Sequence, residues 1–317
     1  MLKNLWICLV CFFCMPLQAQ PGQIVKAHGI EIWYETFGEE KDPALLLIMG
    51  GFAQGILWPT EFCEQLAKAG FYVIRYDNRD TGLSTCFDFG KNPYNLLDMA
   101  QDALGLLDVL KFEKVHHCGF SMGGSIAQLI SAHFPHKVAS LTLLSSSCDL
   151  RPCMLAYDKD YTETALPKPQ QIYLDWMHRF LEMPPQTHEE KLEQRLAAWR
   201  IMNGDQVPFE TERYREIHQE FLDRLKHPES LTNHLPAIKN SFMMLDTVPS
   251  QVQVPTLIIH GSEDPILPPD HGEALHRAIS HSRYVFLQGM GHVLNRCFYD
   301  TIVQEIQQHA FNRWQDQ

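Results

Sequence analysis

Short apolar runs alternate with amphipathic stretches over two separate parts of the chain. Runs such as Ala44–Met49 and Phe71–Tyr76 are mostly apolar and are bounded by glycine or proline, which is typical of strands buried on both faces. Stretches with helical spacing lie between such runs, most clearly at Pro93–Leu110. Strands that alternate with helices predict an α/β fold, a mostly parallel sheet covered by helices on both faces.

The alternation stops for about a hundred residues in the middle of the chain. From about Leu150 to Asp246 the sequence is amphipathic and helical, with prolines as breaks, and the strand–helix pattern resumes at Val254. We therefore predict a core domain formed by residues 21–149 and 247–317, with a helical cap inserted at residues 150–246.

The first twenty residues have the pattern of an export signal. Lys3 precedes the apolar run Leu5–Leu17, and Ala19 provides a small residue for cleavage. This run is shorter than the roughly 20 apolar residues that span a bilayer. We expect residues 1–20 to be a signal peptide and the protein to be periplasmic or secreted, without a stable membrane span after cleavage. The alternative is an uncleaved anchor.

The overall charge narrows the choice of partners. The 317 residues include 26 Lys+Arg and 38 Asp+Glu, a net charge of -12, and no basic run offsets it. An acidic surface repels phosphate backbones and anionic membranes. We therefore expect a small-molecule partner and no nucleic acid.

The cysteines divide between the predicted signal and the remaining chain. Three of the nine lie in the signal, and six remain. An exported protein can oxidise such pairs, and Cys148 and Cys153 bracket a short loop, so we expect a disulfide between them. The alternative is six free buried thiols. The cysteine and histidine spacing fits no metal site, and we expect neither a metal nor another cofactor.

One motif carries nucleophilic chemistry. Gly119-Phe-Ser121-Met-Gly123 is G-x-S-x-G, and it lies where a predicted buried strand meets a predicted helix. Such a turn is so tight that only small residues fit on either side of the serine, whose hydroxyl is then exposed above the sheet. The position predicts that Ser121 is a catalytic nucleophile rather than a simple helix cap.

A nucleophilic serine needs a base, and the base needs an acid that orients it. In this fold class the order along the chain is serine, acid, histidine. Asp264 and His292 follow the last two predicted strands and fit that order. We expect Asp264 to be the acid and His292 the base. Asp149, which follows an earlier strand, is the rival acid.

The reaction also needs donors for the oxyanion. The strand Leu45–Met49 runs into Gly50-Gly51, a turn able to aim an amide at the site. Gly51 and Met122 are the predicted donor pair, and the alternative for the glycines is a plain strand-ending turn. The charged loop after the next strand is interpreted as structural, with Arg79 and Asp80 bracing this edge.

Several stretches carry a family resemblance. They are Leu45-Leu-Leu-Ile-Met-Gly-Gly51, Val73-Ile-Arg-Tyr-Asp77, Arg79-Asp-Thr-Gly82, Trp199-Arg-Ile201 and Gly289-Met-Gly-His292. From about Ile24 to Ala310 the chain resembles an α/β-hydrolase with a helical cap after the sixth core strand. More narrowly, it resembles the aclacinomycin (anthracycline) methylesterases. The resemblance implies a serine esterase with the roles given above. The usual oxyanion strand of the family ends in His-Gly, whereas this one ends in Met49-Gly50.

We therefore predict a serine hydrolase that cleaves carboxylic esters, including methyl esters, through an acyl-enzyme, with apolar acyl groups accepted. A proline iminopeptidase-type aminopeptidase, or another amide or thioester hydrolase of this fold, is the alternative. The glycine-rich iminopeptidase signatures around the oxyanion turn and the nucleophile are missing. A non-catalytic binding module is a third reading, which the complete set of Ser121, Asp264 and His292 disfavours.

Overall fold

A computed structural model of the protein describes residues 20–162 and 165–311. Eight strands form one sheet in the order β1-β2-β4-β3-β5-β6-β7-β8, in which β1 and β2 are antiparallel to their neighbours and the strands from β4 to β8 run parallel. The strands are β1 (Gln20–Ala27), β2 (Ile30–Phe37), β3 (Ala44–Ile48), β4 (Tyr72–Tyr76), β5 (Val115–Phe120), β6 (Val138–Leu144), β7 (Thr256–Gly261) and β8 (Ser282–Leu287). The predicted α/β fold is confirmed.

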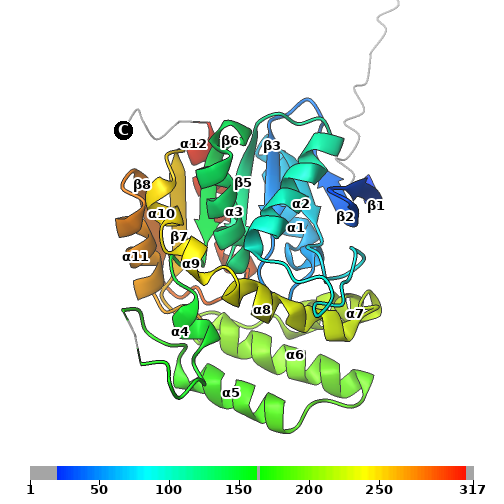
Figure 1. The fold of residues 1–317 in the computed structure, drawn as a ribbon, viewed down its shortest axis with the longest axis vertical. Coiled ribbons are helices and arrows are strands. Elements are labelled where there is room, and N and C mark those ends of the chain that lie inside the picture. The colour runs from blue at the N-terminus through cyan, green and yellow to red at the C-terminus, as the bar shows by residue number, and fades with distance from the viewer. Residues whose placement is uncertain (1–19, 163–164, 312–317) are drawn as a thin grey trace, which may run out of the picture.

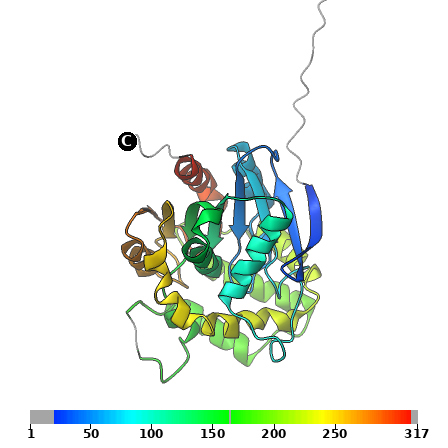
Figure 2. The ribbon, with the colours of Figure 1, turned by 45° about the horizontal axis from the view of Figure 1, so that its top comes forward.

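Helices cover both faces of this sheet (Figures 1 and 2). The first face carries α2 (Leu96–Val109), α3 (Met122–His133) and α11 (Asp270–Ala278), and the second carries α1 (Thr60–Lys68) and α12 (Tyr299–Ala310). The predicted helix from Pro93 begins later, at Leu96, because Asn95 caps it by accepting hydrogen bonds from two amides of the first turn.

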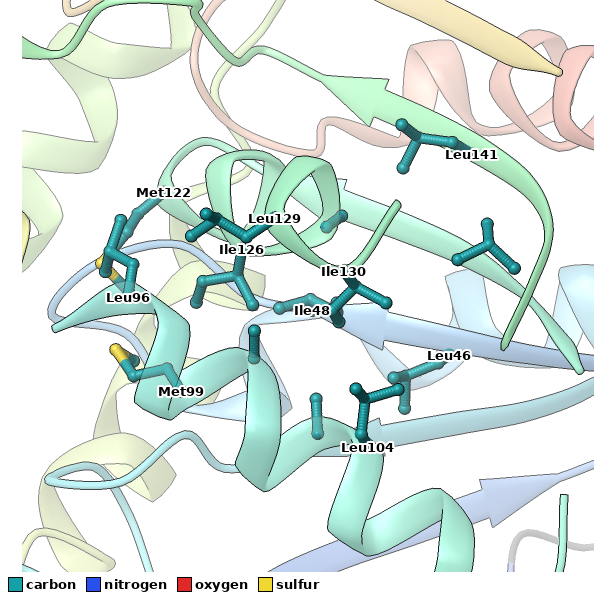
Figure 3. Packing of buried hydrophobic residues seen from close by; sticks show 14 of the residues in the cluster. Leu46, Ile48, Leu96, Met99, Leu104, Met122, Ile126, Leu129, Ile130 and Leu141 are labelled. Carbon is teal, nitrogen blue, oxygen red and sulfur yellow. The ribbon is translucent and has the colours of Figure 1, made fainter. Parts of the chain in front are cut away.

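The strand sequences are apolar throughout because each strand is buried on both sides. Leu46 and Ile48 of β3 pack with residues of α2 and α3, as Figure 3 shows. Leu45 and Leu47 of the same strand point the other way and belong to the cluster that includes α1 and α12. This two-sided burial is what the continuous apolar runs predict.

Seven helices of the described residues lie between β6 and β7. They are α4 (Arg151–Met154), α5 (Gln171–Glu182), α6 (His188–Asn203), α7 (Thr211–Asp223), α8 (His234–Lys239), α9 (Phe242–Leu245) and α10 (Val248–Gln251). Figure 1 shows α5 and α6 as an outer layer below the sheet. In contrast, Ile238 of α8 and Leu245 of α9 pack in the same cluster as the core strands. The second half of the segment predicted as a cap therefore lies directly on the core.

Short 3₁₀ turns complete the described structure. They are η1 (Gly55–Leu57), η2 (Pro135–Lys137), η3 (Pro228–Asn233) and η4 (Arg296–Phe298).

Within the described ranges, no helix has the length and apolar character that crossing a membrane requires. The predicted signal peptide falls on residues 1–20, of which 1–19 lie outside the described residues.

The expected disulfide between Cys148 and Cys153 is wrong for this structure, in which both are free thiols, as are the other four cysteines of the described chain. The loop that these residues were expected to close is partly helical, because α4 begins at Arg151 and includes Cys153. Both side chains pack against the apolar cluster of the first sheet face. Burial raises the pKa of Cys153 to about 12, so its thiol stays protonated.

Candidate active site

Ser121 occupies a strained turn between β5 and α3. Its φ is 54°, a backbone conformation that residues other than glycine rarely adopt. The turn is held by hydrogen bonds on both sides of Ser121, whose amide donates to the Leu144 carbonyl (3.0 Å) and whose carbonyl accepts from the Gly124 amide (2.8 Å). A Cβ atom at Gly123 would lie 2.1 Å from the Ile48 carbonyl oxygen, so glycine is required there. These contacts fix the half-buried hydroxyl at the carboxyl edge of the sheet.

The structure brings the three predicted site residues together. Nε2 of His292 lies 3.1 Å from Oγ of Ser121, and Nδ1 of His292 lies 2.6 Å from Oδ2 of Asp264. The carboxylate accepts the Nδ1–H, so in the neutral imidazole the lone pair is on Nε2 and faces the serine hydroxyl. This is the geometry in which a histidine can remove the proton of a serine.

Asp264 is fully buried and its carboxylate is held on both oxygens. Oδ1 accepts from the amides of Ile266 (3.0 Å) and Leu267 (2.8 Å), and Oδ2 accepts from His292. Burial alone would raise the pKa of this carboxyl, but the neighbouring His292 and the hydrogen bonds hold the pKa of Asp264 below its ordinary value. Asp264 is therefore ionised and able to orient and stabilise the imidazole.

The rival acid lies elsewhere. Asp149 pairs with Arg151, its near neighbour in the chain, and its carboxylate accepts the Arg151 amide (2.9 Å). The acid that contacts His292 is Asp264.

Sequence reasoning missed His260, which lies under the acid. Its Nε2 is 2.8 Å from the Leu267 carbonyl and 3.6 Å from Oδ2 of Asp264. Burial lowers the pKa of His260, so the ring is neutral and its Nε2–H donates to the carbonyl. A Cβ atom at Gly272 would lie 2.6 Å from the His260 ring, so α11 packs closely on it. The only sequence signal is its place at the end of β7, four residues before Asp264.

The loop that carries His292 is attached to α6. The His292 amide donates to the Met202 carbonyl at 2.6 Å. A Cβ atom at Gly291 would lie 2.0 Å from the same carbonyl oxygen, which explains the glycine before His292. A helix inserted between β6 and β7 therefore positions the predicted base.

The two predicted oxyanion donors lie side by side. A Cβ atom at Gly51 would be 3.4 Å from Sδ of Met122, and one at Gly50 would be 3.1 Å from Cβ of Ser121. Met122 is the first residue of α3, so its amide has no carbonyl partner within the helix and lies at the positive end of the helix dipole. The glycine turn and the helix start thus flank Ser121 from two directions.

A second buried histidine, also missed from the sequence, holds the glycine turn. The amide of Phe52 (φ 60°) donates to Nδ1 of His234 at 3.0 Å, and Nε2–H of His234 donates to the Arg79 carbonyl at 2.9 Å. Burial lowers the pKa of His234, which keeps the ring neutral. With 16 histidines in the chain, no sequence signal singles this one out.

The charged loop after β4 braces this edge, as predicted from the sequence. The Arg79 guanidinium binds both carboxylate oxygens of Asp102 in α2 (2.6 and 2.7 Å). Asp80 accepts from the Tyr94 hydroxyl (2.6 Å). Asn78 donates to the Met49 carbonyl (3.0 Å) and so ties the loop to the end of β3. These side chains are occupied by structural contacts.

The fold and this arrangement define the class of the protein. A family model described as "alpha/beta hydrolase fold" matches residues 43–295, and the chain belongs to that family. It is 34% identical over 303 residues to rhodomycin D methylesterase DnrP of Streptomyces peucetius, covering 92% of this chain and 98% of that protein. It is 33% identical over 303 residues, with the same coverage, to rhodomycin D methylesterase DauP of Streptomyces sp. strain C5. The methylesterase resemblance is confirmed, and it supports a carboxylic ester hydrolase.

Solved structures agree on the fold. A 2-hydroxy-6-oxo-6-phenylhexa-2,4-dienoate hydrolase from a Rhodococcus strain superposes with a TM-score of 0.70 at 19% identity, covering 91% of this chain and 99% of that one. At this identity the match shows the shared fold alone.

Proposed function

We propose that this protein is a serine hydrolase that cleaves carboxylic esters through an acyl-enzyme on Ser121. The observation that carries the proposal is the unbroken line of hydrogen bonds from Ser121 through His292 to the buried Asp264 carboxylate. As Oγ of Ser121 attacks the ester carbonyl, its proton passes to Nε2 of His292. The imidazolium then protonates the departing alcohol, and a water molecule, deprotonated by His292, releases the acid and restores the serine.

The developing oxyanion is stabilised in this proposal by the amides of Gly51 and Met122. This assignment is supported by the contact between the glycine turn and the start of α3 beside Ser121. A pre-oriented pair of amides favours the charged intermediate over the neutral ester and therefore accelerates the chemical step.

Methyl esters are the proposed substrates. The relatives that cover nearly the whole chain are named as methylesterases. We expect apolar acyl groups to be accepted, because small-molecule sites in proteins are generally lined by hydrophobic side chains. In the competing aminopeptidase reaction the leaving group is an amine, which must be protonated before it departs. A comparison of kcat/KM for a methyl ester and for proline β-naphthylamide separates the two: we expect the ester to be strongly preferred, and preference for the amide would overturn the substrate class.

The experiment that tests the mechanism is labelling with a fluorophosphonate. The wild-type protein should gain one phosphonyl group on Ser121, located by mass spectrometry of the digest, and should lose ester hydrolysis in proportion. Ser125→Ala, which changes a buried serine one turn further along α3, is the matched control and should label normally. An unlabelled wild-type protein would favour a non-catalytic binding module.

Export is part of the proposal, on the strength of the sequence pattern of residues 1–20. N-terminal sequencing of the protein recovered outside the cytoplasm should begin near Gln20. A full-length protein that starts at Met1 and fractionates with membranes would favour the uncleaved anchor.

A further inference from the structure

The buried side chain of His260 makes one hydrogen bond among the described residues, and that bond is to the loop Asp264–Leu267, which carries the predicted acid. Its Nε2–H donates to the Leu267 carbonyl at 2.8 Å. Nδ1 is buried and has no hydrogen-bond partner. Burying a polar ring is unfavourable unless its polar atoms are bound, so core packing alone does not account for a histidine here. The polar contact of His260 is directed at the loop of the acid.

Leu267 connects His260 to the carboxylate. The Leu267 amide donates to Oδ1 of Asp264 at 2.8 Å, while its carbonyl accepts from His260. Because the amide and the carbonyl belong to one residue, movement of Leu267 away from His260 would also weaken the bond that holds Oδ1. In addition, Nε2 of His260 lies 3.6 Å from Oδ2 of Asp264, the oxygen that accepts from His292. His260 therefore acts on both oxygens of the carboxylate.

The ring of His260 is itself held in place by α11. This helix packs against β7 (Figure 1), and a Cβ atom at Gly272 would lie 2.6 Å from Cγ and 2.8 Å from Nδ1 of His260. Any side chain at Gly272 would displace the ring, so the glycine permits this close approach. Packing thus fixes the direction of the Nε2–H group, as is required of a residue that supports a catalytic group.

We propose that His260 is a positioning residue for the acid, and that it acts through Leu267 to hold the Asp264 carboxylate in the orientation that His292 requires. This inference rests on the proposed esterase function and adds to it a residue that acts only through the acid. Since the acid orients and stabilises the imidazole during the reaction, a misplaced carboxylate should lower kcat and leave KM nearly unchanged.

Two substitutions separate the hydrogen bond of His260 from the bulk of its ring. Gln places an amide donor near the position of Nε2, whereas the shorter Asn reaches only the position of Nδ1. With a p-nitrophenyl ester, we expect His260→Asn to lower kcat by about 10-fold to 100-fold and His260→Gln to retain most of it.

His309→Asn is the matched control for the loss of a buried histidine. His309 is buried, and its Nε2 donates to the carbonyls of Leu141 (3.1 Å) and Pro255 (3.2 Å), where β7 begins rather than where it ends. This variant should have a lower melting temperature but the wild-type kcat.

A double-mutant cycle tests whether His260 acts through the acid. In an Asp264→Asn background, His260→Asn should lower kcat by less than about twofold, because no carboxylate remains to be positioned. Gly272→Ala provides a second variant, which keeps His260, displaces its ring and replaces a helical glycine by a better helix former. It should also lower kcat in the wild-type background and not in Asp264→Asn, and it decides the question if His260→Asn does not fold.

Full kcat in the folded variants, equal losses in His260→Asn and His260→Gln, or losses that multiply with that of Asp264→Asn would each overturn the inference. The esterase function would then still stand, because the wild-type protein would hydrolyse the ester. A wild-type protein that neither hydrolyses the ester nor is labelled at Ser121 would overturn the proposed function, and this inference with it.

Discussion

The amide of Phe52 donates a hydrogen bond to Nδ1 of His234, although the two residues are 182 positions apart in the chain. On the other side of the ring, Nε2–H donates to the Arg79 carbonyl, which fixes the tautomer that leaves the lone pair on Nδ1. Phe52 directly follows Gly51, so this bond sets the direction of the turn proposed to hold the oxyanion. His234 is thus a positioning residue contributed by α8 to the edge of the core sheet.

Two substitutions of His234 separate its two hydrogen bonds. Asn places an acceptor near the position of Nδ1 and keeps the bond to Phe52, whereas Gln places a donor near Nε2 and keeps the bond to Arg79. We expect His234→Gln to lower kcat by about 10-fold to 100-fold with little change in KM, because oxyanion stabilisation acts on the transition state. His234→Asn should retain most of kcat. The measurement is steady-state hydrolysis of a methyl ester.

Affinity for a boronic acid, which forms a charged adduct with the serine, should weaken in His234→Gln in parallel with kcat. Equal losses in the Asn and Gln variants, or losses confined to KM, would mean that His234 supports the fold but not the oxyanion turn.

The second prediction concerns the acid. Asp264→Asn should lower kcat by about 10⁴-fold, because an amide favours the wrong tautomer of His292 and cannot stabilise the imidazolium. Asp149→Asn is the matched control, and it should change kcat by less than about threefold, since Asp149 pairs with Arg151 on another part of the edge. Thermal unfolding of both variants checks that they are folded. The reverse ranking would move the acid to Asp149.

The third prediction concerns stability in acid. His117 of β5 is buried, and burial lowers its pKa to about 3, below the value of about 6.5 in an unfolded chain. Between these values the unfolded chain binds a proton that the folded protein does not. The contribution of His117 to the free energy of unfolding is therefore complete above pH 6.5. Below that pH it is lost, by about 1.4 kcal/mol per pH unit for this one group.

Urea unfolding at pH 7 and pH 5 tests this linkage. Between pH 7 and pH 5 the free energy of unfolding should fall less in His117→Leu than in the wild-type protein, because the unfolded variant cannot bind a proton at this position. His281→Leu, an exposed control, should show the same pH dependence as the wild-type protein. Identical pH dependence in all three proteins would contradict a buried neutral His117.

Much of the fold is predictable because its signals are local. β3 and β4 are recognisable as apolar runs because each strand is buried on both faces. The helices that follow them are recognisable by their spacing because each is buried on one face. Ser121 stands out for the same reason, since the tight turn between β5 and α3 demands glycine at nearby positions. For Asp264 and His292, the order along the chain and the place after a strand suffice to make the prediction.

What the sequence did not predict depends on contacts between distant elements. His234 lies on a helix of the inserted segment, and its role appears only once α8 reaches Phe52. The expected pairing of Cys148 with Cys153 was wrong because short spacing in the chain does not reveal that α4 forms there. Spacing alone does not report side-chain direction.

The most direct test of the central claim is the rate of methyl ester hydrolysis by purified Ser121→Ala compared with the wild-type protein. Ser121 provides the attacking oxygen, and its side chain contacts His292 at the surface of the sheet edge rather than filling the core. We expect kcat to fall by about 10⁴-fold or more with the melting temperature nearly unchanged. Hydrolysis by Ser121→Ala at close to the wild-type rate would contradict the account.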